Sequence, residues 1–337
     1  MSLCWILPLA LIGALAGTAV LRRYALTNSL IDIPNARSSH VLPTPRGGGV
    51  AIVISFILSA ILLALTGQIE WSLMWAIVGP GGAIAVIGFL DDHGHIPARW
   101  RLLGHFSAAI VSMLLLGGLA PVNFFGISLE LGWAGYLFGC FYLVWLLNLY
   151  NFMDGIDGLA SLEAIFVCLG GALLYVVCGQ ASFVWGPIAL ALAVTGFLYW
   201  NFPPARIFMG DAGSGFLGII LGSLSLQAAW VNPALLWGWV ILLGVFIVDA
   251  TCTLMVRLIR GDKVYEAHRS HAYQYASRQF GGHLPITLAV VGINVVWLLP
   301  IATLVAMGSL DGVLGVMIAY VPLVGLALKF KAGQREK

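Results

Sequence analysis

The stretch WSLMWAIVGPGGAIAVIGFLDD, residues 71–92, joins a long uncharged run to a pair of aspartates. Residues 71–90 contain no charged side chain, and about 20 apolar residues are enough for a helix to cross a hydrocarbon core of about 30 Å. We therefore predict a transmembrane helix over 71–90 that ends where Asp91 and Asp92 begin. Pro80 is the place at which this helix could break.

The same pattern recurs along the whole chain. Of the 337 residues, 61% are hydrophobic and 9% are charged, whereas about 25% of the residues of an ordinary soluble domain are charged. Helices satisfy their backbone polar groups internally, as lipid requires. We expect one all-α integral membrane domain, residues 1–337, with about eleven transmembrane helices and ten as the alternative. The predicted spans are 3–21, 47–66, 71–90, 102–120, 133–150, 159–178, 183–200, 215–230, 234–256, 285–307 and 312–330.

The basic residues indicate which loops lie in the cytoplasm. All 16 Lys and Arg residues lie in, or within two residues of, alternate connections, and the other connections contain none. By the positive-inside rule, the basic set is cytoplasmic, the N-terminus is periplasmic and the C-terminus is cytoplasmic. A cleaved signal peptide over 3–21 is disfavoured because no basic region precedes it. The cytoplasmic loops are 22–46, 91–101, 151–158, 201–214 and 257–284.

Three aspartates lie at predicted helix ends on this side. Asp91 and Asp92 are adjacent carboxylates that repel each other, so a bound cation or an accepted proton would explain the pair, with a solvated acid pair as the alternative. Asp211 follows an exposed Phe208 in NFPPARIFMGDAGSGFLG, residues 201–218, and precedes a Gly-rich helix start. At such a position an aspartate could also be a simple N-cap.

The segment NLYNFMDGIDGLA, residues 148–160, places two more aspartates at the cytoplasmic end of a helix. Asp154 and Asp157 are three residues apart and would share one face if the segment is helical. Asn148 lies inside the apolar run, where an unpaired amide is costly, so we expect it to hydrogen-bond toward the loop. The other candidate positions of this segment are Asn151 and Gly155.

Two basic loops supply cations near these acids. NARSSHVLPTPRGGGVAI, residues 35–52, leads into three glycines at a helix start, which favours an anion because free N–H groups point at it. A flexible basic loop at the lipid headgroups is the alternative. RGDKVYEAHRSHAYQ, residues 260–274, has two histidines without a usual third zinc ligand, so we favour cationic anchors for phosphate over a zinc site. The candidates in the two loops are Arg37, His40, Arg46, His268, Arg269 and His271.

These groups all lie on one predicted face of the membrane domain. Several carboxylates combined with Arg, His and Gly-rich helix starts suit Mg²⁺ and phosphates, because Mg²⁺ binds one or two carboxylates together with phosphate oxygens. The periplasmic connections hold only Glu70, Glu130 and Asp311 as acids. We therefore expect the site at the cytoplasmic face.

Five motifs carry a family resemblance: TPRGGG (44–49), GFLDD (88–92), NLYNFMDGIDGLA (148–160), NFPPARIFMGDAGS (201–214) and HRSHAYQ (268–274). Over about residues 32–285 the chain resembles the polyprenyl-phosphate N-acetylhexosamine-1-phosphate transferases of glycosyltransferase family 4, a family that includes phospho-MurNAc-pentapeptide translocase. The resemblance implies transfer of a sugar 1-phosphate from a UDP-N-acetylhexosamine to undecaprenyl phosphate, with release of UMP. It also implies a multi-pass protein of the bacterial inner membrane with a cytoplasmic active site.

The resemblance further implies roles for individual residues. Asp211 would be the principal ligand of Mg²⁺, with Mn²⁺ as an alternative metal, and Asp154 would lie beside it. A phosphate monoester has a second pKa near 6, so the lipid phosphate is mostly dianionic, and we expect Asp91 and Asp92 to position charge and metal more than to remove a proton. The expected catalytic residues are Asp91, Asp92, Asp154, His268 and His271, and the expected substrate-binding residues are Arg37, His40, Arg46, Asn148, Asn151, Gly155, Asp157, Asn201, Phe208 and Arg269.

The motif HRSHAYQ departs from the consecutive histidines of the peptidoglycan branch, because Arg269 and Ser270 separate its two histidines. It most resembles the branch that initiates O-antigen or similar surface polysaccharides, which belongs to lipopolysaccharide biosynthesis. The donor stays open between GlcNAc and a 6-deoxy sugar such as FucNAc or QuiNAc. No nucleic-acid partner is expected, and the oligomeric state is open, with a homodimer as one alternative.

Two other classes share single features with this chain. CDP-alcohol phosphatidyltransferases also carry paired DG aspartates, but the Ala-Arg and the further acids of their pattern are absent after Gly158. Acids inside helices, such as Glu163 and Asp249, would be typical of a transporter. For these two acids we favour support of the active site, because almost no polar residues continue toward the periplasmic side.

Overall fold

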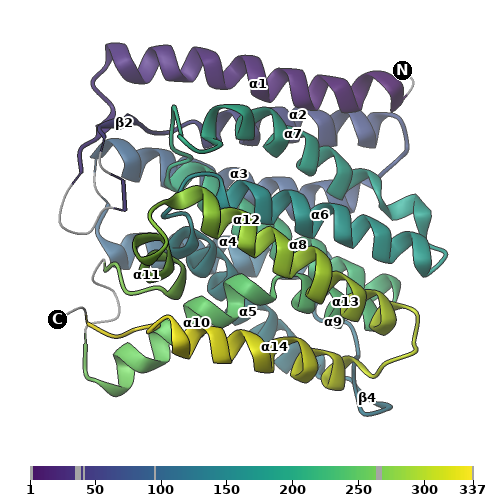
Figure 1. Cartoon of the computed structure of the whole chain (residues 1–337). Helices are drawn as coiled ribbons and strands as arrows, with labels where there is room; N and C mark the ends of the chain where they lie inside the picture. Colours follow the sequence, from purple (N-terminus) through teal and green to yellow (C-terminus); the bar gives the residue numbers. More distant parts are fainter. Residues whose placement is uncertain (1–2, 35–38, 41, 95, 263–267, 336–337) are drawn as a thin grey trace.

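The computed structural model describes residues 3–34, 39–40, 42–94, 96–262 and 268–335, and helices dominate the described part (Figure 1). The predicted all-α class is confirmed. The helices are α1 (Leu3–Thr27), α2 (Gly49–Leu65), α3 (Trp71–Gly94), α4 (Ala98–Leu116), α5 (Gly132–Met153), α6 (Leu159–Val177), η1 (Ala181–Phe183), α7 (Trp185–Asn201), α8 (Asp211–Val231), α9 (Pro233–Leu242), α10 (Gly244–Ile259), α11 (Ala272–Gln279), α12 (His283–Ile293), the π-helical turn η2 (Asn294–Leu298), α13 (Leu299–Ala306) and α14 (Gly312–Lys329). Two antiparallel ribbons pair β1 (Ile31–Asp32) with β2 (Thr44–Pro45) and β3 (Val122–Phe124) with β4 (Ile127–Leu129).

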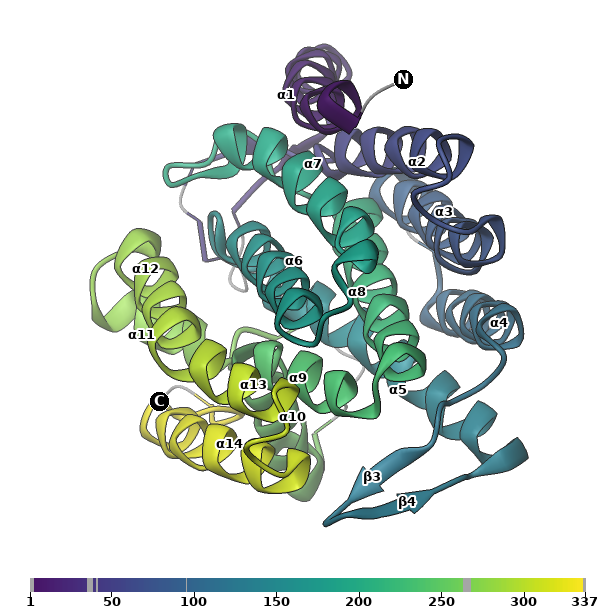
Figure 2. The same ribbon diagram turned by 90° about the vertical axis from the view of Figure 1, so that its right-hand side faces the viewer.

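Helix α8 forms the centre of the helix bundle. Figure 2, in which many helices are seen nearly end-on, shows α8 with α3, α5 and α6 around it, and all three pack against it. In the apolar window of α8, 89% of the residues are buried, against 22% in the windows of α1 and α14. The residue that opens α8, Asp211, is therefore held by the best-packed helix of the protein.

The number of helices that can cross a membrane is close to the predicted number. Eight described helices are long and apolar enough, or nine if the pair α9 and α10, bent by 68°, counts as one span. Helix α2 is apolar but has 17 residues, and α4 opens with Arg99 and Arg101 in its first turn. Each predicted span coincides with a helix or a helix pair, so the chain is a multi-pass membrane protein, and the count of eleven stays a prediction.

Several predicted boundaries are wrong. Most of the predicted loop 91–101 is helical, because α3 continues to Gly94 and α4 begins at Ala98. Helix α3 also runs through Pro80 without a break. The span predicted over 285–307 is confirmed as one helical segment, His283–Ala306. It contains the π-helical turn η2, which begins at Asn294. The Asn294 amide donates a 2.6 Å hydrogen bond to the buried Glu163 carboxylate. A π-turn inserts one extra residue into a helical turn, and such turns are frequent at special sites.

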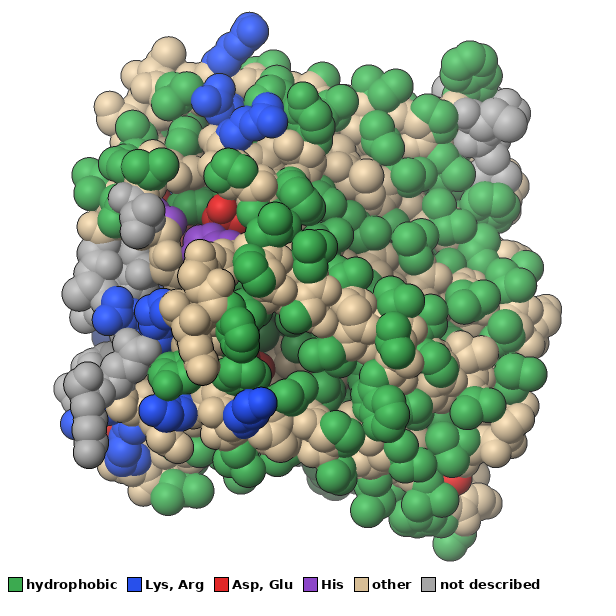
Figure 3. Space-filling view, viewed as in Figure 1, with side chains coloured by type: hydrophobic (Ala, Val, Ile, Leu, Met, Phe, Trp, Pro, Cys, Tyr) green, Lys and Arg blue, Asp and Glu red, His purple; other side chains and the backbone are tan. Residues whose placement is uncertain are grey.

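The surface divides into an apolar body and a charged end. Trp133, Val296 and Ile259 are each more than three-quarters exposed, which is expected for side chains that face lipid rather than water. Figure 3 shows Lys and Arg side chains gathered at one end of the molecule, with histidine and acidic side chains between them. The C-terminus lies at this end and the N-terminus at the other (Figure 1). That the charged end is cytoplasmic stays a prediction from the positive-inside rule.

Candidate active site

A cavity of about 650 Å³ opens at the charged end of the bundle. Its walls come from α3, α4, α5, α8, α10 and α11 and from the loop after α5, so residues that are far apart in the sequence meet there. Of the predicted site residues, the cavity brings together Asp91, Asn148, Asn151, Asp154, Gly155, Asp211, His268 and His271.

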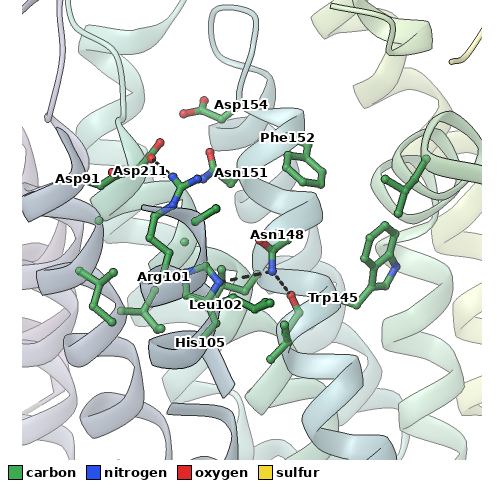
Figure 4. A pocket seen from close by; sticks show the side chains of 18 of the residues that line it. Asp91, Arg101, Leu102, His105, Trp145, Asn148, Asn151, Phe152, Asp154 and Asp211 are labelled. Atoms are coloured by element: carbon green, nitrogen blue, oxygen red, sulfur yellow. Dashed lines mark hydrogen bonds and ion pairs between the residues drawn. The ribbon is translucent and has the colours of Figure 1, made fainter. Parts of the chain in front are cut away.

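Arg101 connects two of the cavity's carboxylates. Its guanidinium contacts the Asp91 carboxylate and lies 3.5 Å from the Asp211 carboxylate, as Figure 4 shows. The other oxygen of Asp91 accepts a 2.6 Å hydrogen bond from the backbone N–H of Ile96. Asp91 is thus a paired, buried carboxylate rather than a solvated loop acid, and Arg101 is a functional candidate that the sequence reasoning did not single out.

Asp92 turns away from the cavity and caps the central helix. Its carboxylate accepts hydrogen bonds from the backbone N–H groups of Asp211 (3.3 Å) and Ala212 (3.5 Å), and Arg46 approaches it to 3.9 Å. The N-cap residue of α8 is Gly210, which has no side chain that could cap the helix. The interpretation of Asp211 as a simple N-cap is therefore wrong, because Asp92 fills that role and leaves the Asp211 carboxylate facing the cavity.

Asn148 does not bond toward the loop as expected. Its amide donates to the carbonyl of Val144, one turn back in the same helix, at 2.7 Å, and lies 3.5 Å from the His105 ring. The preceding turn satisfies the amide, so no loop partner is needed. Figure 4 shows Asn148 and His105 below the carboxylates, toward the apolar part of the cavity.

The loop after α5 presents Asp154 and Gly155 to the cavity. Burial, followed by the negative charges of Asp211, Asp92 and Asp157, raises the pKa of Asp154 well above its usual range. A Cβ added at Gly155 would collide with the Tyr273 hydroxyl. A side chain at position 155 would therefore displace the Tyr273 hydroxyl, which donates to the carbonyl of Phe152 at 3.0 Å.

Asp157 and Asn201 do not line the cavity. The Asp157 carboxylate pairs with His283 at 3.1 Å and accepts the backbone N–H of Ala205 at 3.0 Å. The Asn201 side chain, 2% exposed, accepts from the Gly158 N–H and the Ser161 hydroxyl, both at 3.1 Å. Both side chains therefore hold the loop after α5 in place through hydrogen bonds within the protein. Their predicted contact with the substrate stays a prediction.

The segment before α2 is joined to the segment before α8. Gly48 and Gly49 donate backbone hydrogen bonds to the carbonyls of Phe208 (3.0 Å) and Met209 (2.9 Å). Phe208 is half-buried, not exposed as predicted, and its ring meets the His40 ring edge-on at 4.9 Å. Arg37 lies outside the described residues. None of these three side chains, His40, Arg46 and Phe208, is part of the cavity lining, and their substrate-binding role stays a prediction.

The two histidines of the last motif lie side by side in the cavity wall. Their ring centroids are 4.9 Å apart, and Ser270 bonds to His268 Nδ1 through its hydroxyl at 3.0 Å. Burial, together with the nearby His271 and Arg257, lowers the pKa of His268 to about 3. This shift favours the uncharged ring of His268 when no anion is bound, and its role as a cationic anchor stays a prediction. Arg269 is exposed and does not line the cavity.

The carboxylates in the cavity could supply some, but not all, of the ligands of a hard divalent cation. Within the described ranges, no three His, Cys, Asp or Glu side chains form a group that could hold a metal ion. Asp154 and Asp211 nevertheless offer carboxylate oxygens to the same cavity. This donor set suits Mg²⁺, which usually takes one or two protein carboxylates and completes its shell with water and phosphate oxygens.

Four lining residues with polar or charged side chains were not among the predicted site residues: Arg101, His105, Tyr273 and Gln274. Arg101 and His105 are four residues apart and share one face of α4, and this helical spacing of two polar side chains was the signal that could have found them. Tyr273 and Gln274 gave no comparable signal, because their position depends on how α11 docks.

Fold and cavity together define a multi-pass membrane protein with a charged site at one end. Residues 74–229 match the family model of glycosyl transferase family 4. A Bacillus subtilis protein named "Probable undecaprenyl-phosphate N-acetylglucosaminyl 1-phosphate transferase" is 30% identical over 271 residues, which cover 78% of this chain and 74% of that protein. The decaprenyl-phosphate N-acetylglucosaminephosphotransferase of Mycolicibacterium smegmatis is 33% identical, with 77% and 75% covered. The phospho-N-acetylmuramoyl-pentapeptide-transferase of Moorella thermoacetica is 36% identical over 55% of this chain and 61% of its own length. The chain belongs to glycosyl transferase family 4, and the resemblance seen in its motifs is confirmed.

Proposed function

We propose that this protein transfers N-acetylhexosamine 1-phosphate from a UDP-sugar to undecaprenyl phosphate and releases UMP. The observation that carries the proposal is the composition of the cavity. Asp91, Asp154, Asp211 and Arg101 line the cavity together with apolar side chains such as Leu102 and Phe141. A charged region joined to an apolar one suits a substrate with a phosphate head and a hydrocarbon chain.

The reaction exchanges one phosphoanhydride bond for another. An oxygen of the lipid phosphate attacks the β-phosphorus of the UDP-sugar, and the bond from this phosphorus to the bridging oxygen breaks, so that UMP leaves with that oxygen. The lipid phosphate is already dianionic near neutral pH. The contribution of the protein is then to align two anionic substrates and to stabilise charge on the transferred group.

Within this proposal, Asp211 and Asp154 would hold Mg²⁺, with Mn²⁺ as an alternative. When bound, the metal would supply Lewis-acid stabilisation of the negative charge on the phosphates. Arg101 contacts the carboxylates of both Asp91 and Asp211 and so holds them close together. Asp92 orients the start of α8, so it acts on the position of Asp211 and not on a proton of the substrate.

The donor sugar, the pathway and the membrane side also belong to the proposal. Two relatives are named for N-acetylglucosamine phosphate transfer, which supports GlcNAc over a 6-deoxy sugar. We propose a role in starting O-antigen or a similar surface polysaccharide at the cytoplasmic face of the bacterial inner membrane. The gathering of cations at the cavity's end supports this side.

The test is incorporation of a radiolabelled UDP-sugar into undecaprenyl phosphate by the purified protein. We expect an Mg²⁺-dependent, lipid-linked product and an equal amount of UMP with at least one UDP-N-acetylhexosamine. A panel of UDP-GlcNAc, UDP-FucNAc and UDP-QuiNAc identifies the donor. The absence of transfer from every UDP-N-acetylhexosamine would reject the proposal.

A further inference from the structure

Asp249 is a buried carboxylate of α10 that lies behind the cavity wall and not in its lining. Four donors converge on it. His271 Nδ1 lies at 3.2 Å, the backbone N–H groups of Ala272 and Tyr273 lie at 3.0 and 2.9 Å, and the Thr253 hydroxyl lies at 3.1 Å. A carboxylate that receives this many hydrogen bonds acts purely as an acceptor.

This arrangement determines where the hydrogen of His271 is placed. Because the Asp249 carboxylate can only accept, His271 Nδ1 must carry the hydrogen of the ring, and Nε2 is left without one in the neutral form. His271 lines the cavity. The free nitrogen of its ring is therefore a hydrogen-bond acceptor there.

The neighbouring ring has the opposite arrangement. The backbone N–H of Ser270 can only donate, and it points at His268 Nδ1 at 3.4 Å. Nδ1 of His268 is thus an acceptor, and the hydrogen of this neutral ring lies on Nε2. Two rings stacked at 4.9 Å with a 26° tilt offer the cavity one donor and one acceptor.

We propose that Asp249 is a positioning residue that acts through His271, fixing its tautomer and ring orientation, so that His268 donates to a phosphate oxygen while His271 accepts from a hydroxyl or N–H of the donor substrate. The nature of this ligand rests on the proposed function. Asp249 also caps the start of α11 through Ala272 and Tyr273. The Tyr273 hydroxyl in turn donates to the carbonyl of Phe152 at 3.0 Å.

A purely structural role would predict that Asp249 matters only as this cap, so the experiment must separate the two. We would measure kcat and KM for Asp249→Asn, His271→Asn and the double variant, with thermal unfolding of each. Asparagine has nearly the same size as aspartate, but its side chain has only one accepting oxygen, and its NH₂ group can only donate. We expect Asp249→Asn to lower kcat by about 10- to 100-fold, the range known for carboxylates that orient metal-bound histidines.

The double variant decides between the two roles. If Asp249 acts through His271, the double variant should have a kcat within about twofold of that of His271→Asn alone. A difference of about twofold is the error with which the effects of independent sites add. An equal loss in both backgrounds would reduce Asp249 to a helix cap and overturn the proposal. Thr253→Val is the matched control, because it removes one donor to Asp249 and leaves the histidine bond, and we expect its kcat to stay near wild type.

A spectroscopic measurement on the wild type keeps the proposal testable even if the variants do not fold. Protein with ¹⁵N-labelled histidine is compared with labelled His271→Gln protein to identify the His271 signals, and their chemical shifts report the tautomer. We expect a hydrogen on Nδ1, and a hydrogen on Nε2 with Nδ1 free would overturn the proposal. If the wild type shows no transferase activity, the proposed function fails, while the tautomer is still decided.

Discussion

Gly88 of α3 lies directly against Asp211, the first residue of α8. A Cβ at position 88 would come within 2.5 Å of the backbone carbonyl of Asp211 and of the next backbone nitrogen. The close approach places the end of α3, with Asp91 and Asp92, beside the start of α8. The geometry of the three carboxylates therefore depends on a residue that has no side chain.

Gly88→Ala should separate the two helices. Overpacking of a tightly packed contact costs about 1–3 kcal/mol, and a shift of about 1 Å at a reacting centre can reduce the rate about 100-fold. We expect a lower thermal midpoint and a much lower kcat, measured on detergent-solubilised protein. Gly79→Ala is the matched control in the same helix, because no atom lies within 4 Å of its Cβ position. Equal behaviour of the two variants would contradict the prediction.

Arg101→Ala should leave the carboxylates of Asp91 and Asp211 without their shared cation. Removal of one preorganised donor that stabilises charge in the transition state lowers kcat about 100- to 1,000-fold, and we expect a loss of up to this size. Arg101→Lys should recover only part of the activity, since an ammonium group lacks the planar fork of the guanidinium. The control is Arg99→Ala in the same turn, whose guanidinium lies near the Trp100 ring. A loss with Arg99→Ala as large as with Arg101→Ala would show that helix charge, not the bridge, matters.

Asp154 should make both stability and metal binding depend on pH. Its pKa is raised in the folded protein by burial and by neighbouring carboxylates, whereas an unfolded aspartate ionises near 3.9. Between these values the folded state holds one more proton than the unfolded state, so stability falls as pH rises. Asp154→Asn should then raise the thermal midpoint at pH 7 without metal, and should remove part of the stabilisation by Mg²⁺.

For the same reason, Mg²⁺ binding to the wild type must release a proton, so its apparent affinity should weaken as pH falls. Thermal shift titrations at pH 6 and pH 8 measure both effects. Asp311→Asn at the opposite end of the bundle is the control, because Asp311 caps α14 and asparagine caps equally well. A lower midpoint for metal-free Asp154→Asn at pH 7 would contradict the assigned protonation.

Asn201→Ala should act on folding more than on substrate binding. Besides its two accepted bonds, the Asn201 amide donates to the carbonyl of Ile207 at 3.1 Å. A buried group left without its partner costs about 1–3 kcal/mol. We expect a clear drop in the thermal midpoint, and Asn28→Ala, at an exposed asparagine that bonds only locally, should show little change. An unchanged midpoint with a raised KM for the UDP-sugar would instead support the nucleotide-binding role implied by the family resemblance.

The sequence by itself determined the membrane class, the approximate helix positions and the end of the bundle that carries the charged cavity. Apolar run length and the one-sided distribution of Lys and Arg follow from the solvation of each segment, which does not depend on its neighbours. The same reasoning named Asp91, Asp154, Asp211, His268 and His271, because charged groups beside apolar helices are costly unless they have a function.

Only the tertiary structure decided which of these residues line the cavity and which hold the helices and loops in place. Asp91 and Asp92 are adjacent in the chain, yet one lines the cavity beside Arg101 and the other caps α8. Asp154 and Asp157 separate in the same way, since Asp157 is bound to His283 of α12. These outcomes depend on which side of a helix end meets which neighbour, and that is set by packing between segments more than 100 residues apart. Local sequence spacing contains no information about such contacts.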